Sequence, residues 1–182
     1  ESGSKHVRDG VEKGRFGDTD IELTVKKIRE AGIYVLGNYI FGLPDDTYES
    51  MRETLDLSKR LNTEWGNFYS AMAYPGSQLY GMATKHDWKL PADWLGYSQH
   101  AFETLPLPTE KLSGPEVLAF RDLAHIEYFS NPEYLALVKK MFGQKVVDNV
   151  HDMLKHEIKR KFVTQDMKDR ARVHISGTLK TA

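Results

Sequence analysis

Hydrophobic side chains in the first part of the chain recur at helical spacing and then form an unbroken run. A helix is predicted over residues 20–31, where one apolar stripe is formed by Ile21, Val25 and Ile28. Thr19 and Glu22 have the spacing of a capping box at its start, and Gly32 follows its end. The apolar and aromatic run over 33–41 has the composition of a strand covered on both faces in a parallel sheet.

A second helix and strand follow in the same order. The helix is predicted to begin at Asp46, with Glu49 three residues later, and the next strand covers the run 65–73. Helices that alternate with buried strands imply right-handed parallel crossovers, as in a doubly wound sheet or a (β/α) barrel. Because two strands make no stable sheet alone, we expect a fragment of a larger α/β fold, or a homo-oligomer that covers the open sheet edge.

The rest of the chain is predicted to be mainly helical. Residues 81–112 lack periodicity and predict a long irregular connection, after which Ser113 has the surroundings of a helix N-cap. Two further helices are predicted over 132–142 and 144–161. We therefore divide the chain into three parts: an α/β part over 1–105, a helical C-terminal region over 106–163, and a polar, poorly ordered tail over 164–182.

Composition and charge narrow the function classes. The chain has 182 residues, 40% of them hydrophobic, and a formal net charge of −1, so no bulk field favours nucleic acid as a partner. No apolar stretch approaches the roughly 18–20 residues of a membrane span, and we predict a cytoplasmic protein. The sequence contains no cysteine, which excludes disulfides, thiol nucleophiles and any cysteine-held metal cluster within this chain.

Three segments occur in the order and spacing of a known enzyme family. Residues 37–44 (Gly-Asn-Tyr-Ile-Phe-Gly-Leu-Pro) resemble the fifth-strand motif of radical S-adenosylmethionine (SAM) enzymes. Residues 1–4 (Glu-Ser-Gly-Ser) resemble the segment that leaves the fourth strand, and residues 74–80 (Tyr-Pro-Gly-Ser-Gln-Leu-Tyr) the one after the sixth. The pattern is most similar to the cobalamin-binding subgroup that includes the anaerobic magnesium-protoporphyrin IX monomethyl ester oxidative cyclases. Residues 45–47 (Asp-Asp-Thr) depart from the family's Gly-Glu-Thr.

The resemblance implies the C-terminal part of a radical SAM (β/α) barrel with parallel strands. Ligands of such sheets lie beyond the carboxyl ends of the strands, where residues 42 and 75 fall. The resemblance places the ribose and amino acid part of SAM at Glu1 and Ser2, and the SAM carboxylate at Lys13. It places the adenine along the two strand-end motifs, with these candidate residues: Gly37, Asn38, Ile40, Gly42, Tyr74 and Pro75.

The resemblance also implies cofactors that this chain cannot hold alone. In the family, a [4Fe–4S] cluster is bound by three cysteines in an earlier barrel loop, and the subgroup carries cobalamin in an upstream domain. We therefore expect a fragment of an iron–sulfur and SAM-dependent enzyme, an oxidoreductase or methyltransferase acting on a small organic substrate such as a porphyrin, a lipid or a peptide. The fragment alone is predicted to be inactive.

Other interpretations remain open at this point. The helices from residue 113 could form a noncatalytic interaction or self-association module. A different nucleotide-binding α/β class lacks support, because neither a Walker-type nor a dinucleotide-binding glycine motif occurs. Several local candidates have structural as well as functional explanations. Asp45 and Asp46 are explained by N-capping or as metal ligands or an acid–base pair, and His151 and His156 are candidate metal ligands. The basic cluster on the last helix is a solvated or an anion-binding face: Lys155, Lys159, Arg160 and Lys161. The aromatic residues of the long connection form a satellite core or a substrate-pocket wall: Trp88, Trp94, Tyr97 and Phe102.

Overall fold

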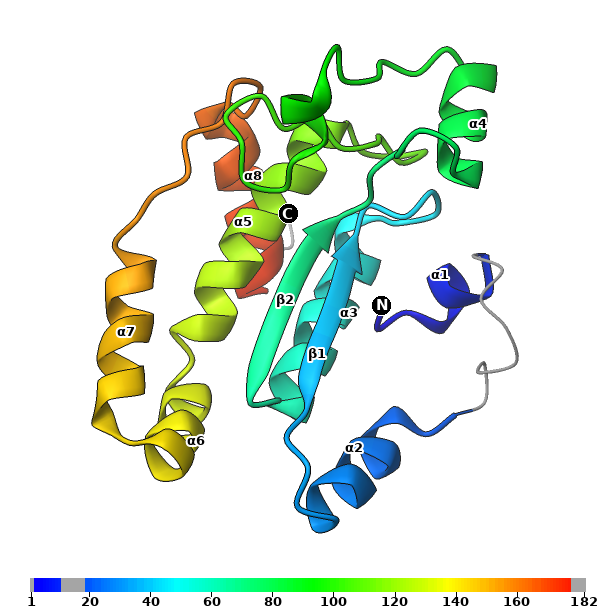
Figure 1. The fold of residues 1–182 in the computed structure, drawn as a ribbon. Coiled ribbons are helices and arrows are strands. Elements are labelled where there is room, and N and C mark those ends of the chain that lie inside the picture. Colours follow the sequence, from blue (N-terminus) through cyan, green and yellow to red (C-terminus); the bar gives the residue numbers. More distant parts are fainter. Residues whose placement is uncertain (1, 11–18, 178–182) are drawn as a thin grey trace.

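The computed structural model describes residues 2–10 and 19–177, and it has the predicted α/β class (Figure 1). Its helices and strands are α1 (Lys5–Gly10), α2 (Ile21–Glu30), β1 (Leu36–Phe41), α3 (Tyr48–Leu61), β2 (Trp65–Ser70), α4 (Gln78–Lys85), α5 (Gly114–Phe129), α6 (Pro132–Phe142), α7 (Gln144–Leu154) and α8 (Gln165–Ser176). A short 3₁₀ turn, η1, covers Trp94–Tyr97. Parallel strands followed by a helical C-terminal region are confirmed.

The two strands pair in parallel, with Leu36 opposite Trp65 and Phe41 opposite Ser70. α3 and α5 pack against one face of this sheet, where Phe41 and Phe68 are buried (Figure 1). On the opposite face Leu36 and Trp65 remain 51% and 38% exposed. Part of this face is covered near the carboxyl ends of the strands, where Val7 of α1 packs with Ile40 and Ala71. The prediction of strands covered on both faces is therefore wrong for the amino ends of the strands.

Helix α3 begins one residue later than the sequence predicts. Its N-cap is Thr47, which forms a capping box with Ser50. Asp46 instead accepts hydrogen bonds from the backbone N–H groups of Gly42 and Leu43 and from the Ser50 hydroxyl. Asp46 is 1% exposed, and this burial raises the pKa of its carboxyl. The three hydrogen bonds that Asp46 accepts keep the turn after β1 closed.

Helix α2 differs from the predicted capping in a similar way. Its N-cap is Asp20, whose carboxylate accepts the backbone N–H of Leu23 at 2.9 Å, so Thr19 is not the cap. The predicted N-cap at Ser113 is confirmed, and its backbone N–H donates to the side chain of Glu116 at 2.9 Å. α6 has the predicted bounds, and its cap is Asn131.

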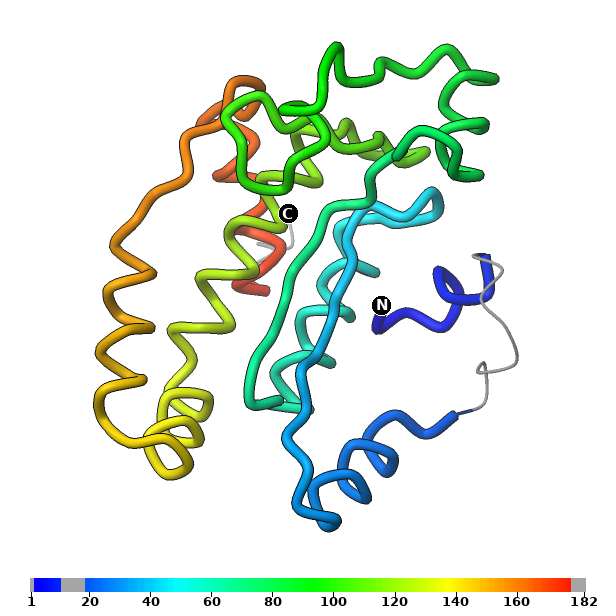
Figure 2. The backbone as a smooth tube through the Cα atoms, in the orientation of Figure 1, coloured from blue at the N-terminus to red at the C-terminus, as the bar shows by residue number. Residues whose placement is uncertain are grey.

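The C-terminal region departs from the sequence prediction at two places. α7 ends at Leu154 instead of continuing to 161, and an extended segment leads from it to α8 alongside α5 (Figure 2). The segment 165–176, expected in a poorly ordered tail, forms α8 and packs against α5. Its apolar stripe is narrow, because only Met167, Ala171 and Ile175 at four-residue spacing contact the core. Three apolar positions among twelve largely polar residues give too weak a periodicity for the sequence to predict this helix.

Side chains occupy the outer edge of β2. Arg121 donates its Nε–H to the carbonyl of Phe68, and the Gln99 amide exchanges two hydrogen bonds with the backbone of Ser70. These are the groups that a further strand would use. Because the backbone groups on the outer edge of β2 are already bonded, β2 is not available to pair with a second copy of the chain. Coverage of the other sheet edge by a second copy stays a prediction. Within the described residues, no helix is long and apolar enough to span a membrane.

Candidate functional site

A cavity of about 740 Å³ lies at the carboxyl ends of β1 and β2, and we call it the strand-end cavity. Ile40 and Leu43 contribute from the β1 end, Ser70 and Met72 from the β2 end, and Gln78 from α4. Figure 1 shows α4 beyond the ends of both strands, with the turn after β1 beside it. This is the position where parallel α/β sheets place their ligands.

The turn after β1 is shaped by packing as well as by hydrogen bonding. Gly42 has φ +81°, and a Cβ at this position would overlap the side chain of Val117 on α5. Only glycine satisfies both the left-handed backbone and the close approach of α5. Because its N–H is already bonded to Asp46, Gly42 holds the wall of the cavity and its amide is not free for a ligand.

The turn after β2 presents an exposed aromatic ring to the cavity. Tyr74 is 47% exposed, its ring stacks on Tyr97 with centroids 6.0 Å apart, and its hydroxyl lies 3.5 Å from the Tyr97 carbonyl. Ser77 caps α4 by accepting the backbone N–H of Tyr80 at 3.1 Å. The ring of Tyr74 therefore offers a flat apolar surface at the rim, steadied by η1.

The structure brings together some of the residues expected to contact SAM. Ile40 and Tyr74 line the strand-end cavity, and Gly42 and Pro75 are their near neighbours in the chain. Ser2 does not line it, since this serine is 2% exposed and its hydroxyl lies 3.2 Å from that of Thr54 on α3. Glu1 and Lys13 lie outside the described residues.

Gly37 and Asn38 lie on β1 before the cavity is reached. Gly37 faces the helices, where a Cβ would meet Tyr39 and the Thr63 hydroxyl. Asn38 lies on the exposed sheet face and accepts a hydrogen bond from the side-chain amide of Asn67 at 3.1 Å, and Asn67 in turn accepts the indole N–H of Trp65. These side chains form a polar row across the open face below the cavity.

Ser70 is a cavity residue that the sequence analysis missed. It is 2% exposed, and its hydroxyl is one of three buried side-chain polar atoms without a hydrogen-bond partner in the described part of the chain. Its backbone is saturated by Gln99, which also lines the cavity. The position of Ser70 near the end of the second apolar run, directly after Phe68 and Tyr69, could have indicated it as a residue at the strand end. Nothing in the sequence indicated Gln99.

The residues considered as metal ligands lie in two separate parts of the fold. Asp46 is consumed by the turn after β1, and the exposed His151 and His156 lie on α7 and after its end. Among residues 2–10 and 19–177, no cluster of three or more potential metal-ligating side chains occurs. Arg160, predicted on a solvated basic face, is buried with its side chain only 1% exposed.

The aromatic residues of the long connection separate into two groups. Tyr97 is 8% exposed and supports Tyr74, while Trp88 packs with a small cluster around Ala83 and Leu107. Trp94 and Phe102 are 74% and 50% exposed. The role of this connection as a substrate-pocket wall stays a prediction.

No protein-family model matches the chain. A curated relative, "Uncharacterized methyltransferase PH0819" of Pyrococcus horikoshii, is 28% identical over 145 residues, which cover 78% of this chain and 30% of that protein. The chain therefore spans about a third of the length of the relative it matches. The matched length takes in most of the described fold, so the chain is similar in sequence to one part of a larger protein named as a methyltransferase.

Proposed function

We propose that this chain forms the adenosine-binding end of the SAM site in a larger SAM-dependent enzyme of the radical SAM type. Two independent observations support the proposal. The strand-end cavity combines Ile40 and Tyr74 at the position expected for the adenine. The curated relative bears the name of a methyltransferase, whose usual methyl donor is SAM.

The observation that carries the proposal is the strand-end cavity, in which Ile40 and the exposed ring of Tyr74 meet at the carboxyl ends of both strands. Adenosine needs apolar surface for the flat faces of its base and a few hydrogen-bonding groups for its edges. Ile40 and Leu43 supply the first, and Gln78 at the start of α4, which also lines the cavity, supplies one of the second.

A [4Fe–4S] cluster does not fit the residues present, because its usual ligands are cysteines and the sequence has none. We assign the cluster to the preceding part of the longer protein, where it would supply the electron for reductive cleavage of SAM. The same proposal includes methyl transfer to, or oxidation of, a small organic substrate such as a porphyrin, and a cobalamin bound upstream. These parts rest on the resemblance of residues 37–44 and 74–80.

Saturation-transfer NMR of SAM with this protein tests the adenosine site directly. We expect saturation to be strongest at the two adenine protons and weaker at the methyl group, because the cavity holds only the base. Ile40→Trp fills the cavity and should abolish the effect. Ile33→Trp, at a 58% exposed position outside the cavity, is the matched control and should retain it. Equal saturation in both variants would refute the site.

The longer protein tests the radical part separately. Its sequence upstream of this chain should contain Cys-x-x-x-Cys-x-x-Cys, and anaerobic reconstitution should give a four-iron cluster and 5′-deoxyadenosine from SAM. SAM cleavage by the present chain alone would contradict the proposal.

Self-association is a second candidate, favoured by a patch of exposed apolar side chains at the amino ends of the strands. The patch consists of Ile33, Tyr34, Leu36, Trp65 and Phe142. The edge-to-face contact of Tyr34 with Phe142, at 5.2 Å between centroids, joins the segment before β1 to α6 across the patch. Light scattering should show a dimer that Leu36→Asp converts to a monomer. A wild-type monomer at all concentrations would reject this candidate.

A further inference from the structure

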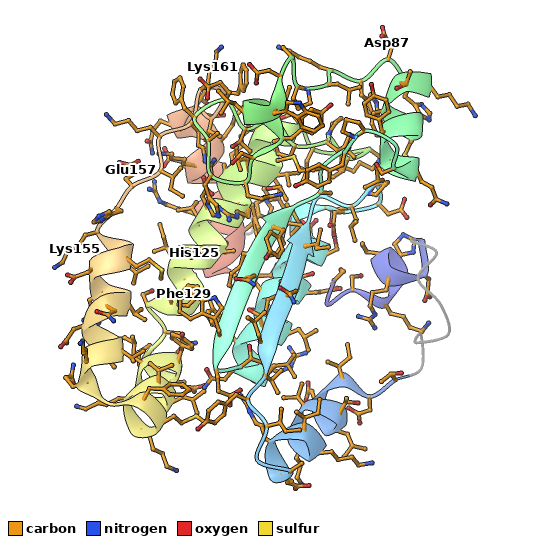
Figure 3. All side chains as sticks on the ribbon, viewed as in Figure 1. Asp87, His125, Phe129, Lys155, Glu157 and Lys161 are labelled. Carbon is orange, nitrogen blue, oxygen red and sulfur yellow. The ribbon has the colours of Figure 1, made fainter. Side chains whose placement is uncertain are left out.

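A second cavity, of about 580 Å³, lies between α5, α8 and the extended segment after α7, and we call it the α5 cavity. Figure 3 shows His125 on α5 along one side, and Lys155 and Glu157 of the extended segment along another. In the described part of the chain it shares no lining residue with the strand-end cavity. A ligand in the α5 cavity would therefore contact none of the residues that line the proposed SAM site.

Arg121, which lines the α5 cavity, and its neighbour Arg160, which does not, carry an excess of buried positive charge. The side chains of Arg121 and Arg160 are 4% and 1% exposed, and they share the single carboxylate of Asp122. Arg160 bonds both oxygens of Asp122 and uses its remaining donors on the backbone of Gln99 and Ala101 and on the Thr104 hydroxyl. Arg160 is thus fully engaged in holding the loop over 99–104 against α5.

Arg121 is not fully engaged. Its Nε–H donates to the Phe68 carbonyl at 2.7 Å and its Nη1 to Asp122 at 2.8 Å, and no bond to a described residue uses Nη2. Nη2 is absent from the buried side-chain atoms that lack a partner, so it keeps access to solvent. Arg121 lines the α5 cavity, which makes Nη2 a donor that a ligand in the cavity can reach.

The neighbouring titratable groups do not neutralise this charge. Burial, and then the Arg121 guanidinium, lower the pKa of His125 to about 4, and the same two causes lower the pKa of His100. Both imidazoles are neutral near pH 7, each with one N–H to donate. Glu157 at the rim is paired with Lys168 at 2.8 Å. The inner end of the cavity is consequently complementary to an anion.

The opposite part of the cavity wall is apolar. Leu123 and Ile126 contribute from α5, Met153 from α7 and Ile158 from the extended segment. Ile126 is 47% exposed, so the outer end is open to solvent. Charge at the inner end and aliphatic surface toward the mouth match a molecule with an anionic head and an apolar tail.

We propose that the α5 cavity binds a small organic carboxylate with an aliphatic chain. The carboxylate accepts hydrogen bonds from Arg121 Nη2 and from a neutral imidazole beside it, and the chain lies against Ile126 and Ile158. A charge-assisted bond from a buried arginine is stronger than a neutral one.

Decanoate, below its micelle concentration, is the test ligand, and histidine ring NMR locates it. The chain has seven histidines, of which His100, His125 and His156 line the α5 cavity. We expect decanoate to shift these three ring signals saturably and to leave the signals of the other four unchanged. Decyltrimethylammonium, with the same tail and the opposite charge, should leave all seven unchanged.

A matched pair of variants at an exposed position tests the charge requirement without disturbing the arginines. Ile126→Glu and its isostere Ile126→Gln both remove the apolar contact of Ile126, and only Glu adds a carboxylate at the mouth. We therefore expect Ile126→Glu to weaken decanoate binding at least threefold more than Ile126→Gln. Equal effects of Glu and Gln, binding of the cationic ligand, or shifts spread over all seven histidines would each overturn the proposal. Thermal unfolding of both variants checks that the fold is intact.

Discussion

Replacing Ser70 by alanine should make the protein more stable and leave SAM binding unchanged. The hydroxyl of Ser70 is buried, and within the described residues it has no hydrogen-bond partner, while the backbone of the same residue is bonded twice by Gln99. Alanine keeps both backbone bonds and removes only the unsatisfied atom. The substitution therefore isolates the hydroxyl from the rest of the strand.

The expected magnitudes follow from the cost of an unsatisfied buried group. Such a group costs about 1–3 kcal/mol, so Ser70→Ala should raise the free energy of unfolding by roughly 1 kcal/mol or more. For a chain of this size that corresponds to a rise in Tm of about 2–4 °C. The side chain of Ser70 lies on the helix-facing side of β2, as that of Phe68 does two residues earlier, and therefore points away from Ile40. SAM binding should therefore be unchanged.

Urea unfolding and SAM titration, run on the same samples, measure the two effects. Ser58→Ala is the matched control, because Ser58 is also fully buried but donates its hydroxyl to the Leu55 carbonyl at 2.6 Å. The control should be unchanged or slightly less stable, with SAM binding as in wild type. A loss of more than about 1 kcal/mol in Ser70→Ala would mean that the hydroxyl has a partner within the protein, and the reasoning would fail.

Three further substitutions test other parts of the fold. Gly42→Ala should destabilise the protein by roughly 1–3 kcal/mol more than Gly76→Ala in urea unfolding, because both have left-handed φ but only residue 42 has a neighbouring side chain in the way. Arg160→Met should cost about 3–5 kcal/mol by breaking a buried charge cluster, whereas exposed Lys159→Ala should stay within about 0.5 kcal/mol. Folding lowers the pKa of His125 from 6.5 to about 4, so its contribution to the free energy of unfolding is fully present above pH 6.5 and is lost as the pH falls toward 4. In urea unfolding at several pH values, His125→Gln should flatten this decline. An unchanged pH profile would show that His125 does not cause it.

The sequence predicted the order of elements well because periodicity and capping are local properties. α2, α6 and the parallel pairing of β1 with β2 follow from apolar spacing and alternation. The error at Asp46 arose because a carboxylate before a helix can bond backward into a turn as well as forward to the helix, and the spacing to later residues does not distinguish the two.

The long-range contacts that define both cavities could not be predicted in the same way. Gln99 bonds Ser70 across 29 positions, and Arg160 bonds Asp122 across 38. Nothing in the sequence around 155–161 distinguishes the buried Arg160 from its exposed lysine neighbours, because only the end of α7 at Leu154 turns the segment back toward α5. Pairings of this kind depend on the tertiary path of the chain.

The strand motif itself shows why a sequence match identifies a fold more securely than a ligand. Along residues 37–42, one set of side chains faces the helices and the other faces the open side, as the alternation of a strand requires. Tyr39 and Phe41 are buried against the helices and Gly42 fits against Val117, so these positions preserve packing. Ile40, which lines the strand-end cavity, is the motif position best placed to touch a ligand. Ile40→Trp should therefore abolish SAM contact in a folded protein, while Gly42→Ala should reduce stability with SAM affinity preserved in the folded fraction. If both variants lost only stability, the motif would report the barrel fold and nothing about SAM.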